Sequence, residues 1–245
     1  MSRLLVFNAD DLGRSAEANE GIATAAAAGF ALEASLMVTC GASSEAGART
    51  GLGTGLHFCL TEGRALTGRM RGLTDSGGRF RPLPWVVAAC LARVPSLDEV
   101  RRELRAQLDR ARALGARVGH LNGHHHVHLL PVVRDAVIDL ARSEGFAHVR
   151  APGARQAIGG LRGRVVAWLG RGFRRAARDS GLRTLPLRSL PLGAGEAEAA
   201  ELMLHPCAGG EEVALLTDPL FPARLLELGI RPARYAETEA VSEIL

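Results

Sequence analysis

The sequence contains no lysine, so all 30 of its basic residues are arginine. Aromatic residues make up only 4% of the chain, whereas proteins that bind single-stranded nucleic acids usually interleave aromatic and basic side chains. No apolar run approaches the ~18 residues that span a membrane, and the apolar stretch after Met1-Ser2-Arg3 is too short for a signal-peptide core. We therefore expect a cytoplasmic protein that does not bind nucleic acid.

Cysteine is also scarce. The chain has four, Cys40, Cys59, Cys90 and Cys207, and no two of them have CxxC spacing. We expect them to be reduced, which argues against a zinc site built from thiolates. With 245 residues the chain can bury a full core, so we expect one domain over residues 1–245.

Segments typical of strands and of helices alternate along the chain. The strands are predicted at Leu4–Phe7, Ala34–Val38, Leu56–Leu60, Val118–Leu121, His148–Arg150 and Leu202–Leu204. The helices are predicted at Ser15–Ala28, from the capping box of Ser96 and Glu99 up to Gly115, and at Val132–Ser143. This alternation predicts a parallel β/α architecture, either an open sheet or a barrel.

Histidine, in contrast, is concentrated in one short segment. Of the eight histidines, five lie between residues 120 and 128: His120, His124, His125, His126 and His128. Imidazole is the commonest metal ligand and titrates near neutral pH, so the cluster indicates metal or acid–base chemistry. If the segment is extended, His124, His126 and His128 share one face. We then expect one of them to bind a metal and the others to contact substrate or support the site.

Polar side chains follow the carboxyl ends of four predicted strands: Asp10-Asp11, His57, His124 and His205. Parallel β/α folds build their sites at this end of the sheet. One carboxylate of the aspartate pair can bind a metal while the other accepts a proton. Each of these residues also has a plain structural reading, as a helix cap, a core histidine or a turn residue. Their shared position favours an active site centred on a metal.

A set of aspartate and histidine ligands without thiolates is a mixed nitrogen and oxygen site. Zinc, manganese, cobalt or magnesium could occupy it, and imidazole favours the transition metals. Three protein ligands leave positions open for water and substrate, which is typical of catalytic sites. A cation of this kind lowers the pKa of water and polarises a carbonyl, so the set suits amide or ester hydrolysis.

Four blocks of the sequence resemble a known family: Asn8–Gly13 (NADDLG), Gly55–Phe58 (GLHF), His120–His128 (HLNGHHHVH) and Leu202–Pro206 (LMLHP). In this order they look like the signature blocks of the YdjC-like carbohydrate deacetylases, which include chitooligosaccharide deacetylases and the hopanoid-biosynthesis HpnK proteins. The resemblance covers residue 3 to about residue 207. It implies a distorted, seven-stranded (β/α) barrel whose active site lies at the C-terminal rim. It also implies that the protein removes the acetyl group from an N-acetylated sugar and uses one divalent metal ion to do so. The ion would be Mg²⁺ or Zn²⁺, with Mn²⁺ and Co²⁺ as alternatives.

Carried over by position, the resemblance implies specific roles. Asp11, His57 and His124 would bind the metal, Asp10 would be the base that activates water, and His205 would be the acid for the leaving amine. The further residues implied as substrate contacts are His126, His128 and Arg150. The sequence departs from the chitobiose pattern at Leu12, at Asn122-Gly123 and around Arg150. We interpret these departures as changes at the substrate rim, which affect the choice of sugar more than the reaction.

Three other functions are alternatives to deacetylation. A metal-dependent phosphoesterase on a similar barrel would often need further carboxylates, and a non-catalytic metal-binding protein would leave Asp10-Asp11 and His205 without a role. A receiver-type phosphoacceptor would not explain the histidines.

The segment Leu161–Asp179 is rich in arginine, with an apolar stripe of Val165, Val166, Leu169 and Phe173 at helical spacing. It is either a surface helix packed on the barrel or a basic amphipathic helix that lies on a membrane, in which case the sugar would be lipid-linked. The sequence leaves a homodimer open.

Overall fold

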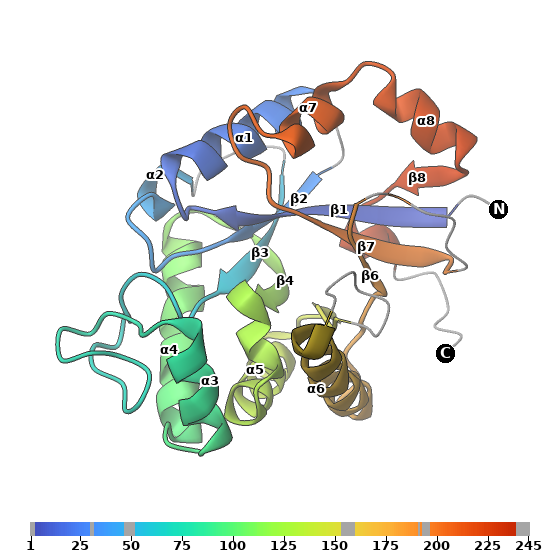
Figure 1. The fold of residues 1–245 in the computed structure, drawn as a ribbon. Helices are drawn as coiled ribbons and strands as arrows, with labels where there is room; N and C mark the ends of the chain where they lie inside the picture. The colour runs from blue at the N-terminus through green and yellow to red at the C-terminus, as the bar shows by residue number, and fades with distance from the viewer. Residues whose placement is uncertain are drawn as a thin grey trace.

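The computed structural model describes residues 3–29, 32–46, 52–152, 160–190, 192 and 197–238. A parallel sheet runs through the molecule in the strand order β5-β4-β3-β2-β1-β7-β6 (Figure 1). Its strands are β1 (Arg3–Leu12), β2 (Leu32–Leu36), β3 (Gly53–Phe58), β4 (Val118–Gly123), β5 (His148–Val149), β6 (Leu187–Arg188) and β7 (Ala199–Leu204). A further short strand, β8 (Ile230–Pro232), pairs in parallel with the first residues of β1.

The sheet curls until its two edge strands approach each other. A single parallel bridge between His148 of β5 and Arg183, just before β6, joins the two edges. There the amide of Val149 donates to the Arg183 carbonyl at 3.0 Å, and the amide of Arg183 donates to the Ala147 carbonyl at 2.8 Å. The prediction of a distorted (β/α) barrel with about seven parallel strands is therefore confirmed.

Helices cover the outside of the sheet. They are α1 (Ala16–Ala27), α2 (Ser43–Ala46), α3 (Leu83–Leu91), α4 (Leu97–Ala113), α5 (Pro131–Glu144), α6 (Gly160–Asp179), α7 (Glu211–Thr217) and α8 (Phe221–Glu227), with 3-10 turns η1 (His124–Leu129) and η2 (Tyr235–Thr238). Figure 1 shows α1, α7 and α8 along one side of β1 and α3 to α6 around the other strands. The predicted caps are confirmed: Ser15 caps α1, and Ser96 with Glu99 forms a capping box on α4. No described helix is long and apolar enough to cross a membrane.

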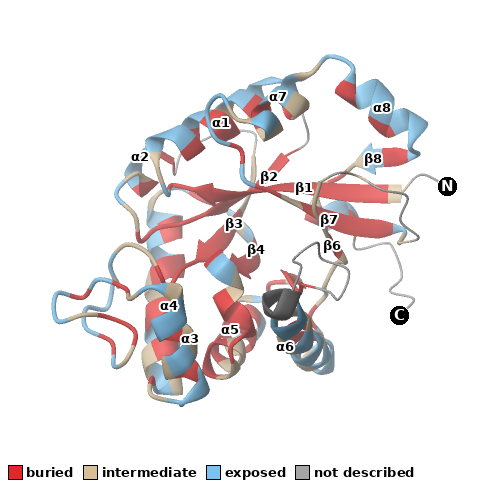
Figure 2. Ribbon diagram, viewed as in Figure 1, coloured by how far each residue is buried: buried red, intermediate tan, exposed pale blue. Residues whose placement is uncertain are grey.

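The strands are buried on both faces, as the red colour of the sheet in Figure 2 shows. Their outward side chains, such as Phe7 and Leu202, join the hydrophobic core under the helices. Their inward side chains are polar and fill the barrel. Gly55 of β3 makes room for one of them, because a Cβ there would lie 2.1 Å from Nε2 of His120. The barrel interior is therefore a polar layer, and the carboxyl ends of its strands carry the candidate site.

Candidate metal centre and active site

The end of β1 has an irregular backbone that brings two neighbouring carboxylates into one site. The strand was predicted to end at Phe7, which is wrong: it continues to Leu12. Between Ala9 and Leu12 the pairing with β2 shifts by one residue, and Asp11 has φ 67°. Successive strand residues normally point to opposite faces, and a bulge of this kind changes that alternation. As a result Asp10 and Asp11 both approach the His57 ring, at 3.7 and 3.3 Å.

Three predicted metal ligands meet at this point. Asp11 Oδ1 lies 3.3 Å from His57 Nε2 and 2.9 Å from His124 Nδ1. The two imidazole nitrogens are 3.3 Å apart. All three side chains are buried, and they come from β1, β3 and the residue directly after β4. The structure thus gathers the ligands predicted at three separate strand ends.

Hydrogen bonds on the outer side of each imidazole ring determine which nitrogen carries the proton, and so which nitrogen presents a lone pair to the other ligands. Asn122 uses its amide group to donate to Ser35 (2.7 Å) and Asp10 (3.2 Å), so its oxygen accepts from Nδ1 of His57 at 2.7 Å. His124 donates through Nε2 to Glu62 at 3.0 Å. In neutral imidazole the other nitrogen then carries the lone pair.

The donor set fits a divalent cation. His57 Nε2 and His124 Nδ1 present their lone pairs to each other and to Asp11 Oδ1, a buried atom that has no hydrogen-bond partner among the residues the structure describes. Such an arrangement is repulsive by itself and favourable around a cation. When no cation is bound, protonated imidazoles can take its place: burial acts to raise the pKa of the Asp11 carboxyl, but hydrogen bonds from His124 and His57 in that state outweigh it and hold the pKa well below its usual range. Asp11 is therefore a carboxylate, as a metal ligand must be.

Asp10 has different surroundings. Both of its oxygens accept hydrogen bonds from the Arg150 guanidinium, and Oδ1 also accepts from Asn8 at 2.8 Å. Burial acts to raise the pKa of Asp10, but Arg150 and His57 outweigh it and hold the pKa well below its usual range. Asp10 is therefore ionised, and it lies beside the ligand group rather than within it. His205, whose side chain is 48% exposed, points Nε2 toward Asp10 Oδ2 from 3.9 Å on the open side.

The remaining members of the histidine cluster are not on one extended face, so that expectation is wrong. Residues 124–129 form η1, and His125 and His126 have φ 54° and 56°. His124 alone among them reaches the group with Asp11 and His57. His128 is only 1% exposed and packs edge-on against Phe173 of α6, with ring centroids 5.3 Å apart. Contact of His126 and His128 with substrate stays a prediction.

Arg150, the third predicted substrate contact, is 2% exposed. Its guanidinium lies between Asp10 and Glu201 of β7, to which Nε donates at 2.7 Å. A role in contacting substrate stays a prediction, and in this structure the side chain organises the barrel interior. Asn122, interpreted from the sequence as part of the substrate rim, is also only 2% exposed and orients His57.

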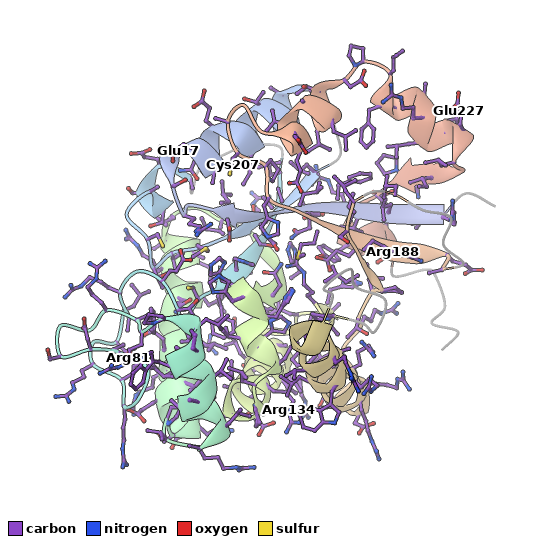
Figure 3. All side chains as sticks on the ribbon, in the orientation of Figure 1. Glu17, Arg81, Arg134, Arg188, Cys207 and Glu227 are labelled. Carbon is purple, nitrogen blue, oxygen red and sulfur yellow. The ribbon has the colours of Figure 1, made fainter. Side chains whose placement is uncertain are left out.

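The loop that carries His205 is fixed against α1. The His205 amide donates to the carboxylate of Glu212 in α7, and the Ala208 amide donates to the Glu17 carbonyl at 3.0 Å. Figure 3 shows Cys207 beside the helix that carries Glu17. A Cβ on Gly21 of α1 would lie 2.6 Å from the Cys207 backbone, so this close packing requires glycine.

Sequence reasoning missed two residues that support the ligands, Glu62 and Arg14. Glu62 follows His57 by five residues, in the loop after β3. An acidic residue so soon after the end of a strand could have been recognised in the sequence as a candidate site residue. Arg14 lies three residues after Asp11, and nothing in the sequence alone distinguishes it from the other arginines.

Comparison with known proteins identifies the family of the chain. It matches the sequence model of the YdjC-like protein family over residues 4–228. The chain belongs to this family. Three relatives and one crystal structure show how far the similarity extends.

A carbohydrate deacetylase of Geobacillus stearothermophilus is 33% identical, over 97% of this chain and 98% of the relative. A chitooligosaccharide deacetylase of Enterobacter sp. (strain 638) is 38% identical over 60% of this chain. A carbohydrate deacetylase of Brevibacillus brevis is 39% identical over 56% of it. The matched segment spans only 59% and 55% of the length of these last two relatives.

The fold is shared with a crystal structure of an Enterococcus faecalis V583 protein provisionally named a cellobiose-phosphate cleavage protein. Its TM-score is 0.76 at 21% identity, over 97% of this chain and 99% of that one.

Proposed function

We propose that this protein is a metal-dependent carbohydrate N-deacetylase, which hydrolyses the acetamido group of an N-acetylated sugar and releases acetate. The observation that carries the proposal is the convergence of Asp11 Oδ1, His57 Nε2 and His124 Nδ1 beside the ionised Asp10. The relatives named carbohydrate and chitooligosaccharide deacetylases support the substrate class. Asp11, His57 and His124 would hold one divalent cation, with nitrogen ligands that favour Zn²⁺, Mn²⁺ or Co²⁺ over Mg²⁺.

In this proposal the two residues flanking the cation move the protons. The cation, when bound, is a Lewis acid that lowers the pKa of water and polarises the acetamido carbonyl. Asp10 accepts a proton from the attacking water, and Arg150 keeps Asp10 oriented and ionised between turnovers. His205, exposed on the open side of Asp10, donates a proton to the departing amine. Acetate and the free amino sugar leave.

The test is an acetate-release screen over N-acetylated sugars, with protein stripped by a chelator and then reloaded with Zn²⁺, Mn²⁺, Co²⁺ or Mg²⁺. We expect one ion per chain and acetate release only from the reloaded protein. Variants His57→Ala and His124→Ala should fold yet lose the ion. Release of phosphate from sugar phosphates without acetate would point to a phosphoesterase instead. Metal binding without turnover of any substrate would point to a non-catalytic protein.

We further propose that the substrate is anionic or linked to a lipid, because α6 presents a basic face beside the site. Its exposed face carries a stripe with spacings of four, three, four and three residues: Arg164, Trp168, Arg171, Arg175 and Arg178. Trp168, which the sequence reading overlooked, is 63% exposed; Val165, assigned there to the packed stripe, is 47% exposed. Basic helices with exposed tryptophan suit anionic membrane surfaces.

The opposite face of α6 packs beside two residues predicted to contact substrate, His128 and Arg150. Phe173 packs on His128, and Arg174 donates to the carbonyl of Pro152, two residues after Arg150, at 2.6 Å. A surface that engages α6 would therefore lie near the site. We expect a higher kcat/KM for a charged or lipid-linked N-acetylated sugar than for diacetylchitobiose, with the advantage falling as salt rises. Equal, salt-insensitive efficiencies would leave the deacetylase proposal standing without this substrate class.

A further inference from the structure

We propose that Glu62 is a positioning residue for the metal-binding side chains and that Arg14 couples it to Asp11. The inference rests on the proposed metal centre. Glu62 Oε1 lies 3.0 Å from His124 Nε2, and the Arg14 guanidinium grips the same carboxylate through Nε (2.9 Å) and Nη2 (3.1 Å). The remaining Arg14 nitrogen, Nη1, lies 3.2 Å from Asp11 Oδ2. The four side chains Asp11, Arg14, Glu62 and His124 therefore form a closed ring, which we call the clasp.

Glu62 is held in place before any ligand binds. The amides of Thr61 and Glu62 both contact the Cys59 sulfur, at 3.4 and 3.2 Å, which closes a tight turn after β3. Gln107 of α4 then bonds the amide and the carbonyl of Cys59, at 3.0 and 2.8 Å. Because the turn is anchored to a long helix, the backbone that carries the Glu62 side chain is held in place, and the carboxylate is then fixed by Arg14 and His124.

The clasp controls the direction of two metal ligands. By accepting from Nε2, Glu62 keeps the His124 proton on that nitrogen and turns the Nδ1 lone pair toward Asp11. A carboxylate in this position also raises the basicity of the coordinating nitrogen. Arg14 binds Oδ2 of Asp11 and leaves Oδ1 directed at both imidazoles. Removing Glu62 would free the His124 ring and Arg14 together.

The same residues could be read as a second metal site, because Glu62, His124 and His125 also form a group of potential ligands. Two observations favour positioning. Both Glu62 oxygens already accept from Arg14, and His125 Nε2 is 4.0 Å from Glu62 Oε1, farther than His124. His124 would moreover have to bridge two ions through its two nitrogens.

The test compares Glu62→Gln with Glu144→Gln. Glu144 is a matched control because it too is a carboxylate gripped by two basic side chains, Arg105 and Arg112, but on the outer surface of α4 and α5. We expect Glu62→Gln to bind Zn²⁺ about 10- to 100-fold more weakly, measured by competition with a chromogenic chelator. Glutamine is uncharged, and its amide NH₂ group would replace the oxygen that accepts from Arg14 Nε, so the two-point contact with Arg14 is lost and the His124 ring has no carboxylate partner. The stoichiometry should stay at one ion.

Several outcomes would contradict the clasp. Unchanged Zn²⁺ affinity in Glu62→Gln overturns it while leaving the proposed function intact. Two ions in the wild type and one in Glu62→Gln would make Glu62 a ligand, which also overturns it. A wild type that binds no ion overturns the proposed function, and the clasp with it. If Glu62→Gln does not fold, Arg14→Ala decides, since that side chain is 44% exposed and the same direction of change is expected.

Discussion

Arg150 provides the sharpest test of how the barrel interior is built. It is 2% exposed, and it is shared between two buried carboxylates, Asp10 and Glu201. Burial acts to lower the pKa of Arg150, but the two carboxylates outweigh it and hold that pKa well above its usual range. Substitution by methionine would keep much of the volume and leave both carboxylates without their cation.

The expected loss follows from this arrangement. Removing one partner of a buried ion pair costs about 3–5 kcal/mol, because the remaining charge stays desolvated. Whole domains are stable by only ~5–15 kcal/mol, so Arg150→Met should lose a large fraction of the unfolding free energy. Arg101 is the matched control. It too joins two carboxylates, Asp98 and Asp139, but its side chain is 45% exposed, and such surface pairs contribute about 0–1 kcal/mol.

Urea unfolding of the two methionine variants and of the wild type measures the difference directly. A loss below about 1 kcal/mol for Arg150→Met would refute the buried-pair argument. The variant Arg150→Lys separates the structural role from the predicted contact with substrate. If Arg150 mainly binds substrate, Arg150→Lys should raise KM at nearly unchanged stability. If it mainly orients Asp10, the loss should appear in kcat and in the unfolding free energy.

Three other predictions concern the base, the acid and the interior. Asp10→Asn should keep the metal and lose roughly 10²-fold or more in kcat, and loss of the metal instead would exchange the roles of the two aspartates. Gly21→Ala should push the loop that carries His205 away and lower kcat about 10²-fold at unchanged metal affinity, whereas Gly172→Ala, with nothing within 4 Å of the added Cβ, should have no effect. Burial lowers the pKa of His120 to about 3 in the folded protein, whereas the unfolded chain has a His120 pKa of ~6.5. As pH falls below ~6.5, His120 is therefore protonated in the unfolded chain but not in the folded protein, which favours unfolding. His120 should therefore lower the free energy of unfolding by about 2 kcal/mol between pH 7 and pH 5. Urea unfolding at both pH values measures this loss, and His120→Asn should remove it.

The sequence was sufficient for the parts of the fold that follow from local chemistry. The Ser96 capping box and the Gly115 stop define α4, and short apolar runs located a strand at or before each candidate site residue. It was not sufficient for the length of β1. After Phe7 the inner face of that strand is polar, with Asn8 and Asp10, and a polar face looks like a loop when only apolar runs are counted. The metal ligands could be predicted because each lies at the carboxyl end of a strand or directly after it.

Their supporting residues could not be predicted in the same way. Asn122 orients His57 across 65 positions of the sequence, and Glu62 orients His124 across 62. Such pairs exist only once the barrel brings β3 and β4 side by side. The histidine cluster failed for a related reason: left-handed backbone at His125 and His126 is set by the turn into α5, and no pattern of side chains in the sequence specifies it.

Asp10 and Asp11 have the same side chain and are adjacent in one strand, yet we assign them different roles, Asp10 as the base and Asp11 as a metal ligand. A regular strand would send one of these carboxylates into the core under the helices. The bulge keeps both on the inner side, and their partners then separate them. Asp10 accepts from Arg150 at both oxygens, and Oδ1 also accepts from Asn8, so a guanidinium already compensates its negative charge. Within the described part of the chain, Asp11 Oδ1 has no hydrogen-bond donor, and it faces two imidazole lone pairs. The expectation that Asp10→Asn keeps the metal follows from this difference in partners, since the two residues do not differ in their own chemistry.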